Sequence, residues 1–153
     1  MSTERFEVRR QLSAPPAKVF ALLCDPQGHV RIDSSGMLQS ADGDQIRQVG
    51  DEFVVHMDRD ALNDRPIGKY DVTVTITKFE PDAAIEWTIV GVTQPPINHR
   101  YGYRLEGNDE GTLAISYCDW SQITERYRTA GIFPIISEAT LRATLGILAR
   151  TVE

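Results

Sequence analysis

The feature that most constrains this sequence is one amphipathic helix that follows a long run of strand-like segments. The stretch from Pro134 to Val152 has apolar side chains at helical spacing, at Ile136, Leu141, Leu145, Leu148 and Val152. It is the only expected helix long enough to fill a curved antiparallel sheet. A sheet wrapped around a single helix tends to leave a space between the two, so this arrangement predicts a ligand cavity.

The strand pattern is clearest between Lys69 and Phe79. Apolar and polar residues alternate there, which is typical of an antiparallel strand with one buried face. The turns between the expected strands contain Gly, Asp, Asn or Pro. The sequence predicts strands at Arg5–Leu12, Met37–Ser40, Glu52–Met57, Lys69–Phe79, Ile85–Ile89, His99–Leu105 and Leu113–Asp119.

Two short helices are expected after the first strand. Pro15 and Pro16 suit the first turn of one helix, where their missing N–H groups have no intrahelical partner anyway. Asp25 and Pro26 then repeat the start signal, as the N-cap and first residue of a second helix that runs to about Ile32.

Composition and charge exclude several classes of protein. With 153 residues, of which 41% are hydrophobic, the chain is expected to form one α+β domain, residues 1–153, with about six or seven strands. Its net charge of −6 argues against nucleic acid or an anionic membrane as the main partner. No apolar run approaches the ~20 residues that span a bilayer, and the N-terminus lacks a signal-peptide pattern. We therefore expect a cytoplasmic protein.

The sequence contains no metal-binding or cofactor-binding motif with diagnostic spacing. Cys24 and Cys118 are too far apart for a zinc motif, and we expect two reduced, mostly buried thiols. No histidine has a partner at spacing such as H-E-x-x-H. Nucleophile elbows, phosphate loops and nucleotide fingerprints are also missing from the sequence. We therefore expect neither a metal nor another cofactor.

Several local motifs, together with the order of the elements, carry a family resemblance. They are Leu12-Ser13-Ala14-Pro15-Pro16-Ala17-Lys18-Val19-Phe20 with Cys24-Asp25-Pro26, the Phe79-Glu80-Pro81 turn before Ile85-Glu86-Trp87, and Gly111-Thr112. The chain resembles the helix-grip fold of the START / Bet v 1-like (SRPBCC) superfamily, and its segment 29–37 resembles a branch labelled polyketide cyclase/dehydrase. Members bind lipids, sterols, polyketides and hormones, and only some are enzymes, so the resemblance implies a fold and a cavity but not an activity. Many relatives have an aromatic residue where this chain has Ile32-Asp33, which implies a more polar cavity mouth here.

Aromatic residues on the apolar strand faces are the main candidates for ligand binding. A ring with a polar tip suits a cavity that holds a flat or partly oxygenated ligand, although ordinary core packing would use the same residues. The candidates are Tyr70, Trp87, Tyr101, Tyr103 and Tyr117.

The three histidines are candidate acid–base groups near neutral pH. His99 shares a strand face with Tyr101 and Tyr103, which points it inward, but its place at the start of the strand would also suit solvent. Alternation along its strand places His56 outside, unless a bulge reverses the register and turns it toward the ligand. For His29, in the second short helix, ligand contact and a solvated surface position stay equally open.

Two charged residues complete the candidate ligand-binding site. Asp119 ends an otherwise apolar face of the last strand, and an inward carboxylate there is costly unless it is paired. Arg10 lies on the apolar face of the first strand, where it could pair with Asp119, anchor a ligand carboxylate or reach solvent. We expect Asp119 to contact Arg10, a tyrosine hydroxyl or the ligand.

Two functions remain open from the sequence. The first is binding or carriage of a small hydrophobic or aromatic ligand, lipid- or polyketide-like, with the long loops 58–68 and 122–133 as lids. The second is a polyketide cyclase, aromatase or dehydratase in which Asp119, His99 or a tyrosine moves protons. The absence of a recognisable catalytic set favours the binder. The sequence also leaves open whether the protein forms a homodimer.

Overall fold

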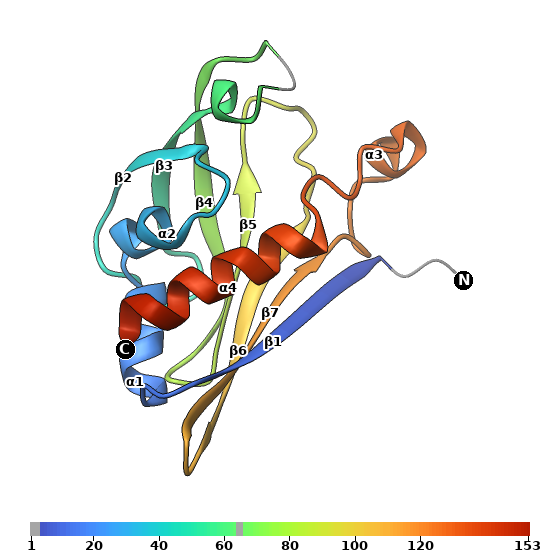
Figure 1. Ribbon diagram of the computed structural model, residues 1–153. Coiled ribbons are helices and arrows are strands. Elements are labelled where there is room, and N and C mark those ends of the chain that lie inside the picture. Colours follow the sequence, from blue (N-terminus) through green and yellow to red (C-terminus); the bar gives the residue numbers. More distant parts are fainter. Residues whose placement is uncertain (1–3, 64–65) are drawn as a thin grey trace.

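The sheet wraps around one helix at the end of the chain. The computed structural model describes residues 4–63 and 66–153. Their seven strands form one antiparallel sheet in the order β1-β7-β6-β5-β4-β3-β2, and the curved sheet encloses helix α4 (Glu138–Val152) (Figure 1). The predicted helix-grip fold is confirmed. The strands are β1 (Arg5–Leu12), β2 (Leu38–Asp42), β3 (Glu52–Asp58), β4 (Lys69–Glu80), β5 (Ala84–Val90), β6 (Arg100–Asn108) and β7 (Gly111–Asp119).

Two short helices, α1 (Pro16–Leu23) and α2 (Pro26–Ile32), connect the strands at the two edges of the sheet. The predicted start of α2 is confirmed, because the Asp25 side chain accepts a hydrogen bond from the Gln27 amide and Pro26 is the first helical residue. The two helices pack closely at Gly28. A Cβ atom on Gly28 would lie 2.1 Å from the Leu22 carbonyl oxygen, so only glycine allows this approach.

Helix α4 begins later than the sequence predicts. Its first residue is Glu138 rather than Pro134, because Ser137 is the N-cap and accepts a hydrogen bond from the Thr140 amide at 3.1 Å. The predicted apolar face is otherwise confirmed, since Leu145 and Leu148 are fully buried against the sheet. None of the helices in the described residues has the length and apolar character that crossing a bilayer requires.

The two long loops contain short helices. A 3-10 helix, η1 (Arg59–Leu62), follows β3, and α3 (Glu125–Ala130) lies between β7 and α4. Arg128 fixes α3 to the start of the chain, because its Nε donates to Glu4 and its Nη2 to the Ser121 carbonyl, both at 2.9 Å. Part of the first predicted lid, residues 64–65, lies outside the described residues. The lid role of both loops stays a prediction.

The strand register corrects one predicted face. Directly opposed residues share a sheet face, and Tyr103 is opposite Ser116, so Ser116 faces α4 while its neighbour Tyr117 lies on the other side. The prediction that Tyr117 and Asp119 point inward is therefore wrong for both side chains. The reason is that β7 is buried on both faces, so its hydrophobic pattern does not identify the inner one.

Candidate ligand cavity between the sheet and the C-terminal helix

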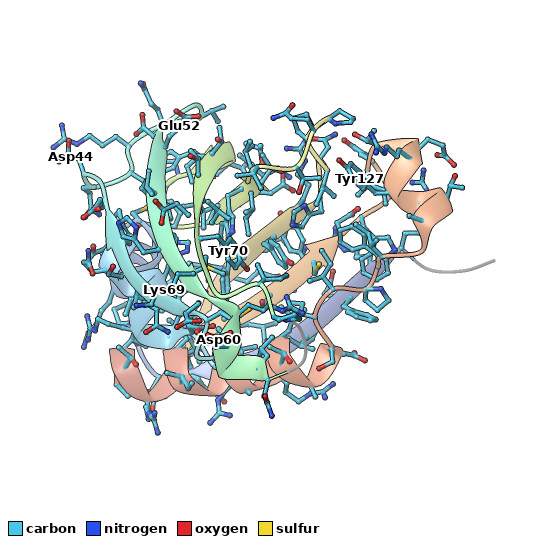
Figure 2. The ribbon with its side chains drawn as sticks, turned by 90° about the horizontal axis from the view of Figure 1, so that it is seen from above. Asp44, Glu52, Asp60, Lys69, Tyr70 and Tyr127 are labelled. Atoms are coloured by element: carbon cyan, nitrogen blue, oxygen red, sulfur yellow. The ribbon has the colours of Figure 1, made fainter. Side chains whose placement is uncertain are left out.

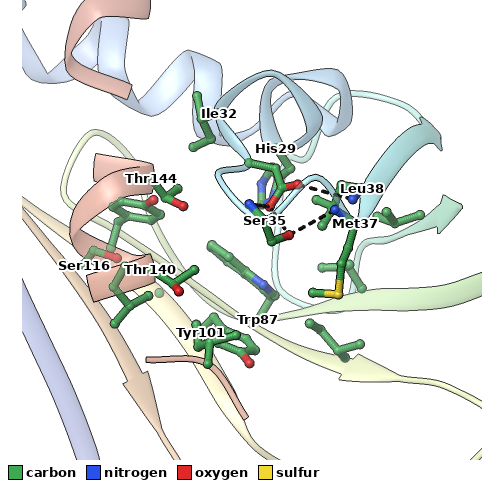
Figure 3. Close-up of a pocket in the computed structure, with 18 of the residues that line it drawn as sticks. His29, Ile32, Ser35, Met37, Leu38, Trp87, Tyr101, Ser116, Thr140 and Thr144 are labelled. Carbon is green, nitrogen blue, oxygen red and sulfur yellow. Dashed lines mark hydrogen bonds between the residues drawn. The ribbon is translucent and has the colours of Figure 1, made fainter. Parts of the chain in front are cut away.

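A cavity of about 180 Å³ lies between the sheet, helix α2 and helix α4 (Figure 3). Its walls come from β3, β4, β5, β6 and β7 on one side and from the two helices on the other. Most of the lining is apolar, as in ordinary small-molecule sites. Representative apolar lining residues are Ile32, Met37, Val55, Val74, Ile89 and Leu141.

Three aromatic rings form one wall of this cavity. Trp87 on β5 is directly opposite Tyr101 on β6, and Tyr103 is the next residue of β6 on the same face. The Trp87 ring centroid lies 6.5 Å from that of Tyr101 and 6.1 Å from that of Tyr103, with interplanar angles of 29° and 27°. The Trp87 ring is thus stacked, at a moderate angle, with each tyrosine ring, and the three rings present a polarisable aromatic surface to the cavity.

The hydroxyl groups of the two wall tyrosines stay protonated. Burial raises the pKa of Tyr103 to about 12, and a hydrogen bond with Ser116 opposes only part of that change. Burial also raises the pKa of Tyr101 well above its ordinary value, and the Tyr101 hydroxyl is hydrogen-bonded to Cys118. Both groups therefore act as neutral polar contacts near neutral pH rather than as bases.

A polar turn lies at the mouth of the cavity, where α2 ends. Asp33 and Ser35 both line the cavity, as the resemblance at Ile32-Asp33 implies. The Asp33 carboxylate accepts four hydrogen bonds from this turn: Ser35 donates from its amide at 3.1 Å and from its hydroxyl at 2.8 Å, Gly36 from its amide at 2.8 Å and Leu38 from its amide at 3.3 Å. The carboxylate thus holds the turn in place, and its acceptor capacity is already used.

His29 is the polar residue that sequence reasoning left undecided. It is 8% exposed, lines the cavity, and packs edge-on against Trp87 at 4.7 Å between ring centroids. Burial lowers its pKa more than the hydrogen bond to Leu23 raises it, so the imidazole is neutral near neutral pH. The helical spacing of α2 could have indicated that His29 is buried. Pro26, His29 and Ile32 follow each other at intervals of three and share the buried face of this helix.

Tyr117 contributes to the cavity wall, but its ring extends across the outer face of the sheet. Its hydroxyl donates to Glu86 at 2.9 Å, and Glu86 lies on that outer face because it alternates with Trp87. The ring crosses Gly102, where a Cβ atom would lie 2.5 Å from both Cζ and the hydroxyl oxygen of Tyr117. Gly102 is thus required for this arrangement.

The remaining predicted site residues are not among the described residues that line the cavity. Tyr70 is half-buried next to Lys69 at the start of β4 (Figure 2). His99 is 4% exposed and packs against Tyr101 and Phe133 with ring centroids 5.2 and 5.3 Å away. Burial lowers the pKa of His99 to about 4, and Arg100 adds to this effect.

Arg10 and Asp119, the two charged residues predicted in the site, do not contact each other. Arg10 faces α4 as predicted, but β1 is an edge strand, so its side chain is exposed and its Nη1 lies 3.8 Å from the position of a Cβ on Gly146. Asp119 pairs instead with Arg5, with Arg5 Nη1 2.9 Å from Asp119 Oδ2. The expected contact of Asp119 with Arg10, a tyrosine hydroxyl or the ligand is therefore replaced by a pair with Arg5 on the outer face. Ligand binding by the eight predicted residues stays a prediction; four of them, Trp87, Tyr101, Tyr103 and Tyr117, line the cavity.

Two further predictions concern polar and sulfur-containing side chains elsewhere. His56 lies outside, as predicted, with Nδ1 2.7 Å from Asp71 and Nε2 2.6 Å from Asp42. Cys24 and Cys118 are free and buried, as predicted. In the described part of the chain, no group of three or more His, Cys, Asp or Glu side chains is arranged to hold a metal ion.

The curved sheet, the gripped helix and the apolar cavity between them define a helix-grip protein with an internal site. A family described as polyketide cyclase / dehydrase and lipid transport matches residues 3–153. The chain therefore belongs to this family. The family description spans both lipid transport and cyclase or dehydrase chemistry.

Individual relatives are more distant. The chain is 27% identical over 97 residues to uncharacterized protein Rv0088 of Mycobacterium tuberculosis, a match that covers 63% of this chain and 38% of that protein. Its fold is similar to that of protein CV1439 from Chromobacterium violaceum, with a TM-score of 0.67, 16% identity and coverage of 98% and 97% of the two chains. It is also similar to the Polyketide_cyc-like protein Cgl2372 from Corynebacterium glutamicum, with a TM-score of 0.56, 18% identity and coverage of 99% and 90%. At these identities the two structures support the fold alone.

Proposed function

We propose that this protein binds a small, flat, largely apolar molecule in the cavity between its sheet and α4. The stacked rings of Trp87, Tyr101 and Tyr103 on one wall carry this proposal. The volume of about 180 Å³ is somewhat larger than the ~150 Å³ of an apolar cavity known to hold benzene. A ligand with one or two fused rings matches both the size and the shape of this wall.

The alternative function is a polyketide cyclase, aromatase or dehydratase in the same cavity, which the family description keeps open. The acid–base groups proposed from the sequence give it little support. Asp119 pairs with Arg5 on the far face of the sheet, and His99 is not among the described lining residues. The wall tyrosines have raised pKa values. These observations favour a binding or carrier role.

Fluorescence tests the binding role directly. The chain has two tryptophans, so a Trp120→Phe variant leaves Trp87 as the only indole emitter. We expect 8-anilinonaphthalene-1-sulfonate (ANS) to bind this folded variant and to change the Trp87 emission, because Trp87 lies in the cavity wall. A Trp87→Ala/Tyr103→Ala protein with native unfolding cooperativity should lose most dye binding. Unchanged dye binding in that protein would place the site elsewhere.

Native mass spectrometry of protein purified from its own host addresses the natural ligand. We expect a co-purified small molecule that is released when α4 packing is weakened by Leu145→Ala. The same spectrum reports whether the chain forms the homodimer left open above. Turnover of a co-purified molecule by the protein on incubation would favour the cyclase alternative.

A further inference from the structure

The hydrogen bond between His29 and Leu23 fixes which imidazole nitrogen carries the proton. His29 Nε2 lies 2.8 Å from the carbonyl oxygen of Leu23, the last residue of α1. The last four carbonyls of a helix have no intrahelical donor, so this carbonyl needs an outside partner. Because a carbonyl only accepts, Nε2 must donate, and the neutral ring then has a bare Nδ1 lone pair.

This Nδ1 atom is available to a ligand. Among the described residues, His29 Nδ1 has no hydrogen-bond partner. Two side-chain atoms in this part of the chain lack a partner and are also fully buried, Thr88 Oγ1 and His99 Nδ1, and His29 Nδ1 is not one of them. It therefore keeps some accessible surface, although the residue is 92% buried and lines the cavity. Figure 3 shows His29 entering the pocket from α2, on the side of the Trp87 ring.

Several other polar groups of the wall have protein partners. The Asp33 carboxylate accepts from the turn after α2. Thr144 Oγ1 lies 2.7 Å from Ser34 Oγ. These groups share their hydrogen-bonding capacity with protein partners, whereas the bare His29 nitrogen has no protein partner in the described part of the chain.

We propose that His29 Nδ1 is a fixed acceptor that selects ligands with a hydroxyl group on an aromatic ring. This inference rests on the proposed function, because it names the polar group that the ligand of that cavity carries. The aromatic wall contacts the ring of the ligand, and the hydroxyl at the ring edge donates to Nδ1. Burial lowers the pKa of His29, which keeps the acceptor unprotonated near neutral pH.

A matched pair of probes tests the selection. 2-Naphthol and 2-methylnaphthalene have nearly the same shape, but only the first carries a hydroxyl donor. We expect equilibrium dialysis at pH 7 to give a dissociation constant about threefold to tenfold lower for 2-naphthol, the range that one net hydrogen bond provides. Equal constants would overturn the inference while the proposed function stands. Binding of neither probe would overturn both.

Two variants assign the preference to one residue. His29→Phe keeps an aromatic ring in the wall and removes Nδ1, so the preference for 2-naphthol should be lost or reversed, because its hydroxyl then has no acceptor at this position. Thr144→Val is the matched control, because it removes a different hydroxyl from the cavity and leaves His29 in place; the preference for 2-naphthol should persist. Preference that survives His29→Phe, or that disappears in Thr144→Val, would contradict the proposal.

A measurement on the unmodified protein does not depend on whether His29→Phe folds. Long-range ¹H–¹⁵N correlation spectra should show His29 as the Nε2–H tautomer. Its Nδ1 resonance should move on addition of 2-naphthol and stay nearly constant with 2-methylnaphthalene. A proton on Nδ1 of His29 in the free protein, or identical shifts with both probes, would overturn the proposed acceptor.

Discussion

Arg5 and Asp119 pair across β1 and β7, with Arg5 Nη1 2.9 Å from Asp119 Oδ2, on the sheet face that turns away from α4. The Arg5 guanidinium also lies over the Tyr117 ring, with its Cζ 4.1 Å from the ring centroid. This pairing makes Asp119 a structural residue of the outer face. The Asp119 carboxylate, which the sequence predicts in the ligand site, therefore lies on the opposite side of the sheet from the cavity.

Asp119→Asn should therefore change stability and leave ligand binding unchanged. We expect a loss of about 0.5–1.5 kcal/mol in the free energy of unfolding, since the pair is partly exposed and asparagine retains one acceptor oxygen. Urea unfolding and ANS titration measure the two quantities. A clear change in dye affinity with unchanged stability would return Asp119 to the candidate site.

The stabilising effect of Asp119 should also depend on pH. Burial would raise the pKa of Asp119, but hydrogen bonds from Ser121 and Arg5 outweigh burial and lower it from its ordinary value of 3.8. A lowered carboxyl pKa stabilises the fold above the ordinary value, and this contribution is lost as the pH falls through the folded-state pKa. The difference between wild type and Asp119→Asn should thus shrink below pH 3.8. A difference that is constant from pH 7 to pH 2 would contradict it.

Leu145→Ala tests the grip of the sheet on α4. Leu145 is 1% exposed, so the substitution should cost ~2–5 kcal/mol through lost burial and a new cavity. Arg150→Ala on the exposed face of the same helix is the control and should change stability by less than about 0.5 kcal/mol. A Leu145→Ala cost below about 1 kcal/mol would mean that the helix face is assigned wrongly.

Gly102→Ala should disturb the outer face through Tyr117. The new Cβ would lie 2.5 Å from the Tyr117 ring, so the ring must move and its bond to Glu86 must weaken, at a cost of about 1–3 kcal/mol. Gly91→Ala is the matched control, because its Cβ would make only an ordinary 3.6 Å contact with Val72. In a Tyr117→Ala background, Gly102→Ala should cost less. An equal cost in both backgrounds would exclude the ring as the cause.

His56 should stabilise the protein more at mildly acidic pH. Hydrogen bonds to Asp42 and Asp71 raise its pKa above the ordinary value of 6.5. A raised histidine pKa gives stability that is fully present below the ordinary value and is lost as the pH rises through the folded-state pKa. The difference in Tm between wild type and His56→Gln should therefore be larger at pH 5.5 than at pH 9, and smaller in high salt. The opposite order would contradict the pairing.

The two cysteines should be unreactive in the native protein. Burial raises the pKa of Cys24 to about 11 and that of Cys118 to about 12, so almost no thiolate forms at pH 8. We expect Ellman's reagent to label both thiols only after unfolding in guanidinium chloride. Rapid labelling of one thiol under native conditions would indicate local opening of its surroundings.

The parts of the fold that depend on local pattern were predictable from the sequence. The alternation in β4, the Asp25 cap of α2 and the apolar face with Leu145 each depend on residues close together in the chain. The late start of α4 was missed because Ser137 was not recognised as a cap.

The parts of the site that depend on long-range pairing were not predictable in the same way. β7 is buried on both faces, so only its register with β6 reveals which residues face the cavity. The partner of Asp119 depends on the register of a strand at the other end of the chain. The spacing of α2 places His29 on the buried face, but its partners, the Leu23 carbonyl and the Trp87 ring, become visible only when the helices and the sheet are placed together.

The strand order also has a consequence for the kinetics of folding. β2 to β7 follow one another in space as they do in sequence, so successive hairpins can form them by short loop closures. β1 joins this meander by pairing with β7, and its Arg5 meets Asp119 across 114 residues of chain. Such a non-local contact carries a large entropic cost before it is formed. We expect hydrogen exchange during refolding to protect the amides of β4 and β5 earlier than those of β1, so that the edge of the sheet beside β7 would be completed last.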